Sequence, residues 1–357
     1  MRNRIAKIAS IMMVLALALT LMVGCVAQEE TLTIYQAGSL AVPFDELKTE
    51  FESTHPNVEV LCESGGSATM INKAITVAEA GETPPDIIAS ADYELIPDRL
   101  YEDGYADWYI AFARNEMVLC YRDGAPGSDE ILNSSRTWYD VLRNDPVSYG
   151  HGNPDDDPCG YRTLMVIQLA QKYYYDNATE FGLTPDSSAD GLYDALIPGN
   201  EHDRGRVGGS KEVVRPKSVD LIAAIQSGDL DYAFEYSSVA AQHSLNFIEL
   251  DDAIDLGSLS MIGGTNITYE EFYQGASIEI VTEPGTPPAY SAQNGAPVVY
   301  GITILKDTEN KELAVEFVAL LLSQEGQDAM EASGQPFIQP VICDHPENLP
   351  AELEGLL

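Results

Sequence analysis

The sequence predicts an α/β protein of two lobes, in which sheets with parallel strands are covered by helices. Three observations lead to this prediction. Short strand-like runs alternate with amphipathic segments, and Gly and Ser lie in the turns between them. The 333 residues from 25 to 357 exceed the usual size of a single hydrophobic core. The sequence also shows no internal repeat of solenoid length, which would have indicated an elongated array.

The N-terminal segment is predicted to be a secretory signal. Three basic residues precede an apolar run over residues 8–23, and Cys25 follows Leu-x-x-Gly. This arrangement resembles a lipobox, so we expect residues 1–24 to be removed and Cys25 to carry a lipid anchor. The alternative is an uncleaved signal anchor, because the run approaches the roughly 18 to 20 residues that span a bilayer. Under both interpretations the folded part lies outside the cytoplasm.

The charge of the chain excludes some partners. Removal of residues 1–24 leaves 16 basic and 57 acidic residues, a net charge of −41. A surface this acidic disfavours nucleic acid and anionic lipid. At physiological salt the Debye length is about 8 Å, so the exterior repels a small anion only weakly.

The first part of the chain repeats a strand, a Gly/Ser turn and a helix. Such repeats call for parallel strands with helices on both faces of the sheet. The predicted elements are a strand at 31–35, a helix ending near 55, a strand at 58–62, a helix at 68–80 and a strand at 86–90.

The same pattern returns in the second half, after a middle segment at 124–209 that is rich in Gly, Pro, Asp and Asn. The predicted elements are helices near 161–175, at 220–226 and from 237, strands at 230–235 and 297–305, and helices at 313–321 and 323–332.

Two strand-to-helix turns are candidate anion sites. Unpaired N–H groups and the positive end of the macrodipole lie at a helix start. Gly38 with Ser39, and Ser67 after Gly66, would add hydroxyl donors and close backbone approach. The alternative is that they are ordinary turn and cap residues.

A third turn places Asp157 and Pro158 before the helix near 161–175, as an N-cap and a first helical residue. The three carboxylates of 155–157 also suggest a calcium site, although their spacing lacks the alternation of the known twelve-residue loop. Tyr236 ends the strand at 230–235, and its hydroxyl is expected to face the carboxyl edge of the sheet.

The sequence shows no catalytic constellation and no cofactor motif. The five His residues are isolated, and neither His-Glu-x-x-His nor Gly-x-Ser-x-Gly occurs. We therefore expect a binding protein and not an enzyme. A secreted hydrolase using the carboxylates of 155–157 and a calcium-stabilised adhesion protein are the alternatives. Four cysteines, which allow three pairings or none, remain beyond Cys25: Cys62, Cys120, Cys159 and Cys343.

Several ordered motifs between residues 31 and 353 resemble the archaeal-type tungstate/molybdate-binding protein of ABC importers. They are Ala37-Gly38-Ser39-Leu40, Ala89-Ser90-Ala91-Asp92-Tyr93 with Ile96-Pro97, Tyr105-Ala106-Asp107-Trp108-Tyr109 with Phe112-Ala113-Arg114-Asn115-Glu116, Asn153-Pro154 through Asp157-Pro158-Cys159-Gly160-Tyr161-Arg162, Ser238-Val239-Ala240 with Gln242-His243, and Val299-Tyr300-Gly301-Ile302-Thr303.

The resemblance implies a type II periplasmic-binding-protein-like α/β fold, with two lobes of mixed sheets covered by helices and joined by two crossing strands. One lobe is expected to comprise residues 31–111 and 304–357, and the other residues 112–303. The implied ligand is tungstate or molybdate, held in the cleft without any other cofactor. The implied partners are an ABC permease and its ATPase, and the chain is expected to be a monomer.

The resemblance also implies which residues bind the anion. Those expected to meet its oxygens are Gly38, Ser39, Ser67, Pro158, Cys159 and Tyr236. Asp157 is expected to bond directly to the metal centre. A carboxylate facing an anion is repulsive in a low-dielectric cleft. Tungsten and molybdenum can expand their coordination, whereas sulfur cannot, so Asp157 is expected to reject sulfate.

The sequence departs from the family at Ser218. The resemblance implies a second carboxylate ligand at this position, a Glu eighteen residues before the tyrosine that corresponds to Tyr236, but this chain has a serine there. Three alternatives follow: a less expanded coordination, replacement by Glu212 or Glu235, or a changed anion preference. We expect the first, with Ser218 donating to the anion and the same anions bound.

Overall fold

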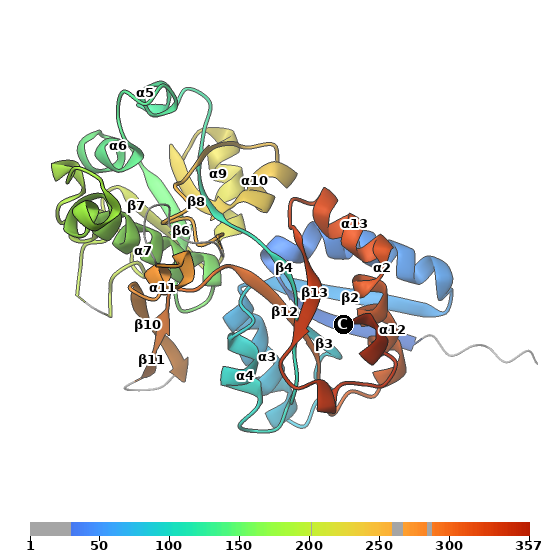
Figure 1. The fold of residues 1–357 in the computed structure, drawn as a ribbon. Coiled ribbons are helices and arrows are strands. Elements are labelled where there is room, and N and C mark those ends of the chain that lie inside the picture. Colours follow the sequence, from blue (N-terminus) through green and yellow to red (C-terminus); the bar gives the residue numbers. More distant parts are fainter. Residues whose placement is uncertain (1–29, 201, 259–266, 284–287) are drawn as a thin grey trace, which may run out of the picture.

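The computed structural model describes residues 30–200, 202–258, 267–283 and 288–357, and Figure 1 shows two lobes. We define lobe 1 by a six-stranded sheet and the helices that pack on it. Its strands, in spatial order, are β13 (Phe337–Cys343), β4 (Ile110–Arg114), β12 (Val299–Ile304), β3 (Ile87–Ser90), β1 (Glu30–Ala37) and β2 (Val58–Gly65). Its helices are η1 (Gly38–Leu40), α2 (Ala41–Thr54), α3 (Ser67–Glu79), α4 (Leu95–Leu100), α12 (Lys311–Leu322), α13 (Gln324–Ala332), η6 (Pro346–Asn348) and η7 (Glu354–Leu356).

Lobe 2 is defined by a five-stranded sheet and its helices. Its strands, in spatial order, are β7 (Glu212–Arg215), β6 (Tyr149–Gly152), β8 (Tyr232–Tyr236), β5 (Met117–Tyr121) and β9 (Asn246–Glu249). Its helices are α5 (Ser128–Leu132), α6 (Trp138–Asn144), α7 (Pro158–Gln171), η2 (Lys172–Asp176), η3 (Ala178–Phe181), η4 (Ser187–Ala189), α8 (Leu192–Leu196), η5 (Ser218–Leu221), α9 (Ile222–Ser227), α10 (Ser237–Gln242) and α11 (Tyr269–Tyr273). A separate hairpin of β10 (Ser277–Glu283) and β11 (Ala289–Asn294) packs against α7.

The parallel strands of each lobe direct their carboxyl ends to one edge. In lobe 1, β1 is parallel to β2 and β3, and in lobe 2, β6 is parallel to β7 and β8. The strands β12, β13 and β5 pair in the antiparallel sense, so both sheets are mixed. The turns after β1, β2, β6 and β7 therefore lie at the edges from which the candidate site is built.

The chain passes from lobe 1 to lobe 2 after β4 and returns before β12, and these two strands pair with each other. Figure 1 shows them at the junction of the lobes. Asn115 follows β4 directly, and its Nδ2 donates to the hydroxyls of Ser238 and Tyr300, at 2.7 Å each. The predicted boundaries at 111/112 and 303/304 fall within β4 and β12, and they remain a prediction.

Aromatic packing supports each lobe. In lobe 1, the ring of Phe317 packs at 5.9 Å from that of Phe44 and at 5.5 Å from that of Phe51, joining α12 to α2. In lobe 2, Trp138 meets Phe234 edge to face at 5.7 Å, which fixes α6 against β8. The apolar face of α2 was expected from the sequence pattern, whereas α6 lies in the middle segment for which no helix was predicted before residue 161.

Two further expectations concern anchoring and thiols. The predicted signal at 1–24 and Cys25 lie outside the described residues, and no helix within the described ranges is long and apolar enough to cross a membrane. The four remaining cysteines are free thiols, so none of the three pairings is present.

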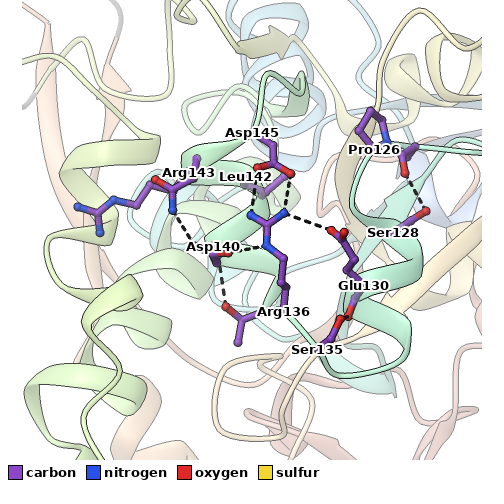
Figure 2. A network of polar contacts seen from close by, with 12 residues as sticks. Pro126, Ser128, Glu130, Ser135, Arg136, Asp140, Leu142, Arg143 and Asp145 are labelled. Carbon is purple, nitrogen blue, oxygen red and sulfur yellow. Dashed lines mark hydrogen bonds and ion pairs between the residues drawn. The ribbon is translucent and has the colours of Figure 1, made fainter.

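A polar network holds α5 and α6 together far from the junction of the lobes (Figure 2). The guanidinium of Arg136 lies 3.2 Å from Glu130, 2.7 Å from Asp140 and 2.7 Å from Asp145. The hydrogen bonds from Arg136 hold the pKa of Asp145 below its usual value. The ionised form of Asp145 is thus favoured in the folded state. Its stabilising contribution is present above the ordinary pKa of Asp and is lost as the pH falls through the lowered pKa.

We expect Arg136→Met to lower the free energy of unfolding by about 1 kcal/mol at neutral pH, because these pairs are partly exposed. The difference from the native chain should shrink in acid, as the pH falls through the lowered pKa of Asp145 and the charge that pairs with Arg136 is lost. Urea unfolding at neutral pH and in acid measures it. Arg143 is the control, because it donates to the carbonyls of Ser188 and Asp190, which do not titrate. Arg143→Met should therefore lower the free energy of unfolding by the same amount at both pH values. If the loss of unfolding free energy in Arg136→Met were as large in acid as at neutral pH, ion pairs of Arg136 would not be its cause.

Candidate oxyanion site between the lobes

The two lobes meet at the carboxyl edges of their parallel strands. Thr69, in the first turn of α3, donates its N–H to the carbonyl oxygen of Asp156 at 3.4 Å. Gly66 approaches the same carbonyl so closely that a Cβ there would lie 2.0 Å from the oxygen. Gly38 packs against Val219 of η5. The turns predicted to bind an anion in lobe 1 therefore face those of lobe 2.

In lobe 1 the two predicted serines are buried and oriented. Ser39 Oγ accepts a hydrogen bond from the hydroxyl of Tyr300 at 3.0 Å, and Ser67 Oγ accepts one from the N–H of Ala91 at 2.9 Å. A hydroxyl carries one hydrogen and two lone pairs. Because a lobe 1 donor occupies a lone pair of each serine, the hydroxyl hydrogen is left to donate to another acceptor.

Asp157 joins two strand ends of lobe 2. Its Oδ1 accepts from the N–H of Cys159 at 3.1 Å and caps α7, and its Oδ2 accepts from the N–H of Ser218 at 2.6 Å. Burial raises the pKa of Asp157 to about 6, although these two N–H groups and Arg162 act in the opposite sense. Asp157 is thus mainly ionised at neutral pH. The N–H of Cys159 is directed to this carboxylate, and Pro158 beside it has no N–H to offer.

Arg162 is a functional residue that the sequence analysis did not single out. It is buried, and its Nη1 donates to the hydroxyl oxygen of Tyr236 at 2.8 Å and to the carbonyl of Ala91 at 2.6 Å. Its Nη2 lies 3.2 Å from the carboxylate of Asp92, which also accepts from the hydroxyl of Tyr161. Because Arg162 occupies a lone pair of Tyr236, the hydroxyl hydrogen of that tyrosine is available to an acceptor.

The structure separates the two glutamates that could replace the missing carboxylate at position 218. Glu212 is at the amino end of β7, and its Oε1 lies 3.0 Å from Nε2 of His151. Glu235 is at the carboxyl end of β8, beside Tyr236. Burial raises the pKa of Glu235 to about 8, the N–H of Tyr236 opposes this, and the nearby charge of Asp157 adds to it. Of the two glutamates, Glu235 is the one that lies beside Tyr236 and close to the charge of Asp157.

The calcium alternative for residues 155–157 is wrong. Asp155 forms an ion pair with Arg206 at 2.7 Å and accepts from the N–H of Val281. Asp156 accepts from Asn153 Nδ2 at 2.8 Å, and Asp157 caps α7. These carboxylates have separate partners and do not form the shared oxygen cage that calcium needs. Within the described ranges no group of three acidic, His or Cys residues could hold a metal ion.

Comparisons with known proteins identify the family to which the chain is similar. The model of the bacterial extracellular solute-binding protein family matches residues 32–335. A solute-binding protein of Methanoculleus marisnigri is 41% identical over 320 residues, 88% of this chain and 83% of that protein. The molybdate/tungstate-binding protein of Pyrococcus abyssi is 36% identical over 368 residues, 98% of this chain and 97% of that protein. The resemblance inferred from the motifs is confirmed.

Solved structures share the fold at low identity. A sulfate-binding protein of Mycobacterium tuberculosis has a TM-score of 0.53 and 12% identity, with 87% of this chain and 88% of that chain covered. A substrate-binding protein of an Agrobacterium tumefaciens ABC transporter has a TM-score of 0.51 and 13% identity, with 93% and 86% covered. The predicted two-lobed periplasmic-binding fold is confirmed by this likeness.

The close approach of Gly66 to the carbonyl of Asp156 allows the contact between the lobes to be tested by substitution. Gly66 has φ −63° and ψ 136°, which alanine adopts without strain, so Gly66→Ala should leave lobe 1 folded. Its Cβ would clash with the Asp156 carbonyl of the opposing lobe. Under the function proposed below, tungstate affinity should fall at least about tenfold, and the radius of gyration with tungstate should exceed that of the native chain. Titration calorimetry and small-angle scattering measure these.

Gly355→Ala is the matched control, because a Cβ at Gly355 would meet nothing within 4 Å. It should behave like the native chain in both measurements. A Gly66→Ala variant as compact and as tightly binding as the native chain would show that the lobes do not close through this contact.

Proposed function

The chain belongs to the bacterial extracellular solute-binding protein family, and on this premise we propose that it captures tungstate or molybdate for an ABC importer. Membership makes the chain an extracytoplasmic solute-binding protein of such importers, a family of transport proteins and not of enzymes. The identity of the anion is the finer step. It is supported by the chemistry of the residues that converge between the lobes.

One observation carries the proposal: neutral donors from both lobes converge around one ionised carboxylate. Ser39 and Ser67 come from lobe 1, and Tyr236 and Ser218 from lobe 2. The partners of the first three leave their hydroxyl hydrogens to donate, which suits an oxyanion. The N-termini of α3 and α7 add favourable dipoles. A tetrahedral oxyanion fits this donor set.

Asp157 supports the choice among oxyanions. An ionised carboxylate repels an anion whose central atom cannot accept another ligand, and burial strengthens this repulsion. A tungsten or molybdenum centre can instead accept a carboxylate oxygen as an additional ligand. Asp157 therefore penalises sulfate and phosphate and tolerates tungstate and molybdate. Binding of another oxyanion is the alternative outcome of the test below.

The proposal also includes a lipid anchor on Cys25 and the permease and ATPase of the importer as partners. Cys25 would carry the lipid, and because β1 begins at Glu30, lobe 1 would lie close to the membrane. A monomeric chain would then present the closed lobes to a permease that works with its ATPase. These features rest on the sequence motif and on the family relationship.

Titration calorimetry with tungstate, molybdate, sulfate and phosphate tests the proposed ligand. We expect the native chain to bind the first two and not the others. In Asp157→Asn the side-chain oxygen can still cap α7, but the charge is lost. Tungstate affinity should therefore fall about 10- to 100-fold, the effect of losing a charge-assisted contact.

Asp155→Asn is the control, because Asp155 is paired with Arg206 away from the donors, and it should bind like the native chain. A native chain that binds none of the four anions would refute the proposed function. Tight tungstate binding that is indifferent to Asp157→Asn would refute the role of Asp157.

A further inference from the structure

We propose that Glu235 is a ligand-contacting residue of this site, a neutral carboxylic acid that donates a hydrogen bond from Oε1 to the bound oxyanion. The inference rests on the proposed function and adds a residue that the motif comparison does not supply. Glu235 stands where two strand ends and the first turn of α7 meet.

The position of the carboxyl group places it at the anion site. Glu235 is 1% exposed. Its Oε2 accepts from the N–H of Tyr236 at 2.9 Å, and Cys159 Sγ lies 3.8 Å from the same oxygen. The carboxyl group therefore turns back over the end of β8, toward the start of α7. The Ser218 hydroxyl and the Asp157 carboxylate are close enough to affect its pKa.

The pattern of hydrogen bonds assigns the proton to one oxygen. Oε2 accepts from the N–H of Tyr236, and the thiol of Cys159 can donate either to Oε2 or to the carbonyl of Phe234, so Oε2 acts as the acceptor oxygen. Oε1 is buried and forms no hydrogen bond with a described residue, although the Ser218 hydroxyl lies close enough to act on the carboxyl group. A proton on Oε1 thus leaves Oε2 free to accept, and it gives Oε1 a hydrogen to donate.

Burial and charge favour the neutral acid. No Lys, Arg or His among the described residues lies within ion-pair distance of Glu235. A buried carboxylate without a cationic partner is costly. The charge of Asp157 adds to this cost, and both effects raise the pKa of Glu235. The other titratable groups around it, Cys120 on β5 and Cys159 on α7, keep their protons because burial raises their pKa.

A neutral acid solves a problem that a second carboxylate would create. With Asp157 ionised, another negative oxygen would repel the incoming anion in a low-dielectric site. A protonated Glu235 presents an O–H donor in place of that charge. The bound anion supplies the acceptor that Oε1 lacks among the described residues, so binding satisfies a buried polar atom.

Two substitutions with opposite expectations test the donor. Glu235→Gln keeps the size of the side chain and a donor amide, so tungstate affinity should stay within about threefold of native. Glu235→Leu keeps the volume but removes the donor, so affinity should fall roughly tenfold or more. Circular dichroism and thermal melting establish which variants fold. A folded Glu235→Leu variant that binds like the native chain would overturn the inference.

Infrared difference spectroscopy gives a readout that a structural role would not move. Adding tungstate to the native chain should shift the carbonyl band of a protonated carboxyl group, because its O–H gains an acceptor. The shift should be absent in Glu235→Gln and present in Glu212→Gln, whose partner is His151. The native spectrum tests the proposal even if Glu235→Leu does not fold.

The outcomes separate this inference from the proposed function. If the native chain binds neither tungstate nor molybdate, the proposed function fails. If the native chain binds them and the carboxyl band does not shift, or shifts equally in Glu235→Gln, only the role of Glu235 fails.

Discussion

The closed arrangement of this protein depends on the buried guanidinium of Arg162. A buried cation is tolerated only with charged or strongly polar partners. Arg162 belongs to lobe 2, yet its carboxylate partner, Asp92, and its carbonyl partner, Ala91, belong to lobe 1. Separation of the lobes would leave the cation without these partners. The same guanidinium donates to the hydroxyl oxygen of Tyr236 and leaves the hydroxyl hydrogen of that tyrosine to donate. The contact between the lobes and a donor of the candidate site thus depend on one side chain.

The two carboxyl groups of the site differ because their donors differ. Asp157 receives backbone N–H groups on both oxygens, from Cys159 and Ser218. Glu235 receives a backbone N–H, from Tyr236, on Oε2 alone. Burial is the main cause of the raised pKa for both, and it is opposed by two backbone N–H groups at Asp157 and by one at Glu235. When their environments push the pKa values of two carboxyl groups apart, the two groups can be in different protonation states at the same pH. One group can act as a charge and the other as a neutral acid.

Sequence patterns predicted the strands whose alternation is strong, such as β1, β2 and β8, and placed Ser39, Ser67 and Asp157 at turns that do meet. They missed β6, a Tyr-Gly-His-Gly strand without an apolar run, because tertiary packing stabilises it. Arg162 was part of a recognised motif, but its partners Ala91 and Asp92 lie about 70 residues away. The calcium alternative failed for the same reason, since Arg206 reaches Asp155 from 51 residues away. Partners at such separations are invisible to local patterns.

The last constraint follows from the proposed function, which requires a chain with a strongly negative charge to bind an anion. Over distances beyond about 8 Å salt screens the exterior, so the equilibrium is decided by groups in contact with the ligand. Those groups are hydroxyls, helix N-termini and the neutral acid that we propose at Glu235, together with one ionised carboxylate. Such a site owes little to attraction between net charges. Under the proposed function, its selectivity would come instead from whether the anion's central atom can accept an oxygen of Asp157. A local balance of this kind permits an acidic surface without loss of anion affinity.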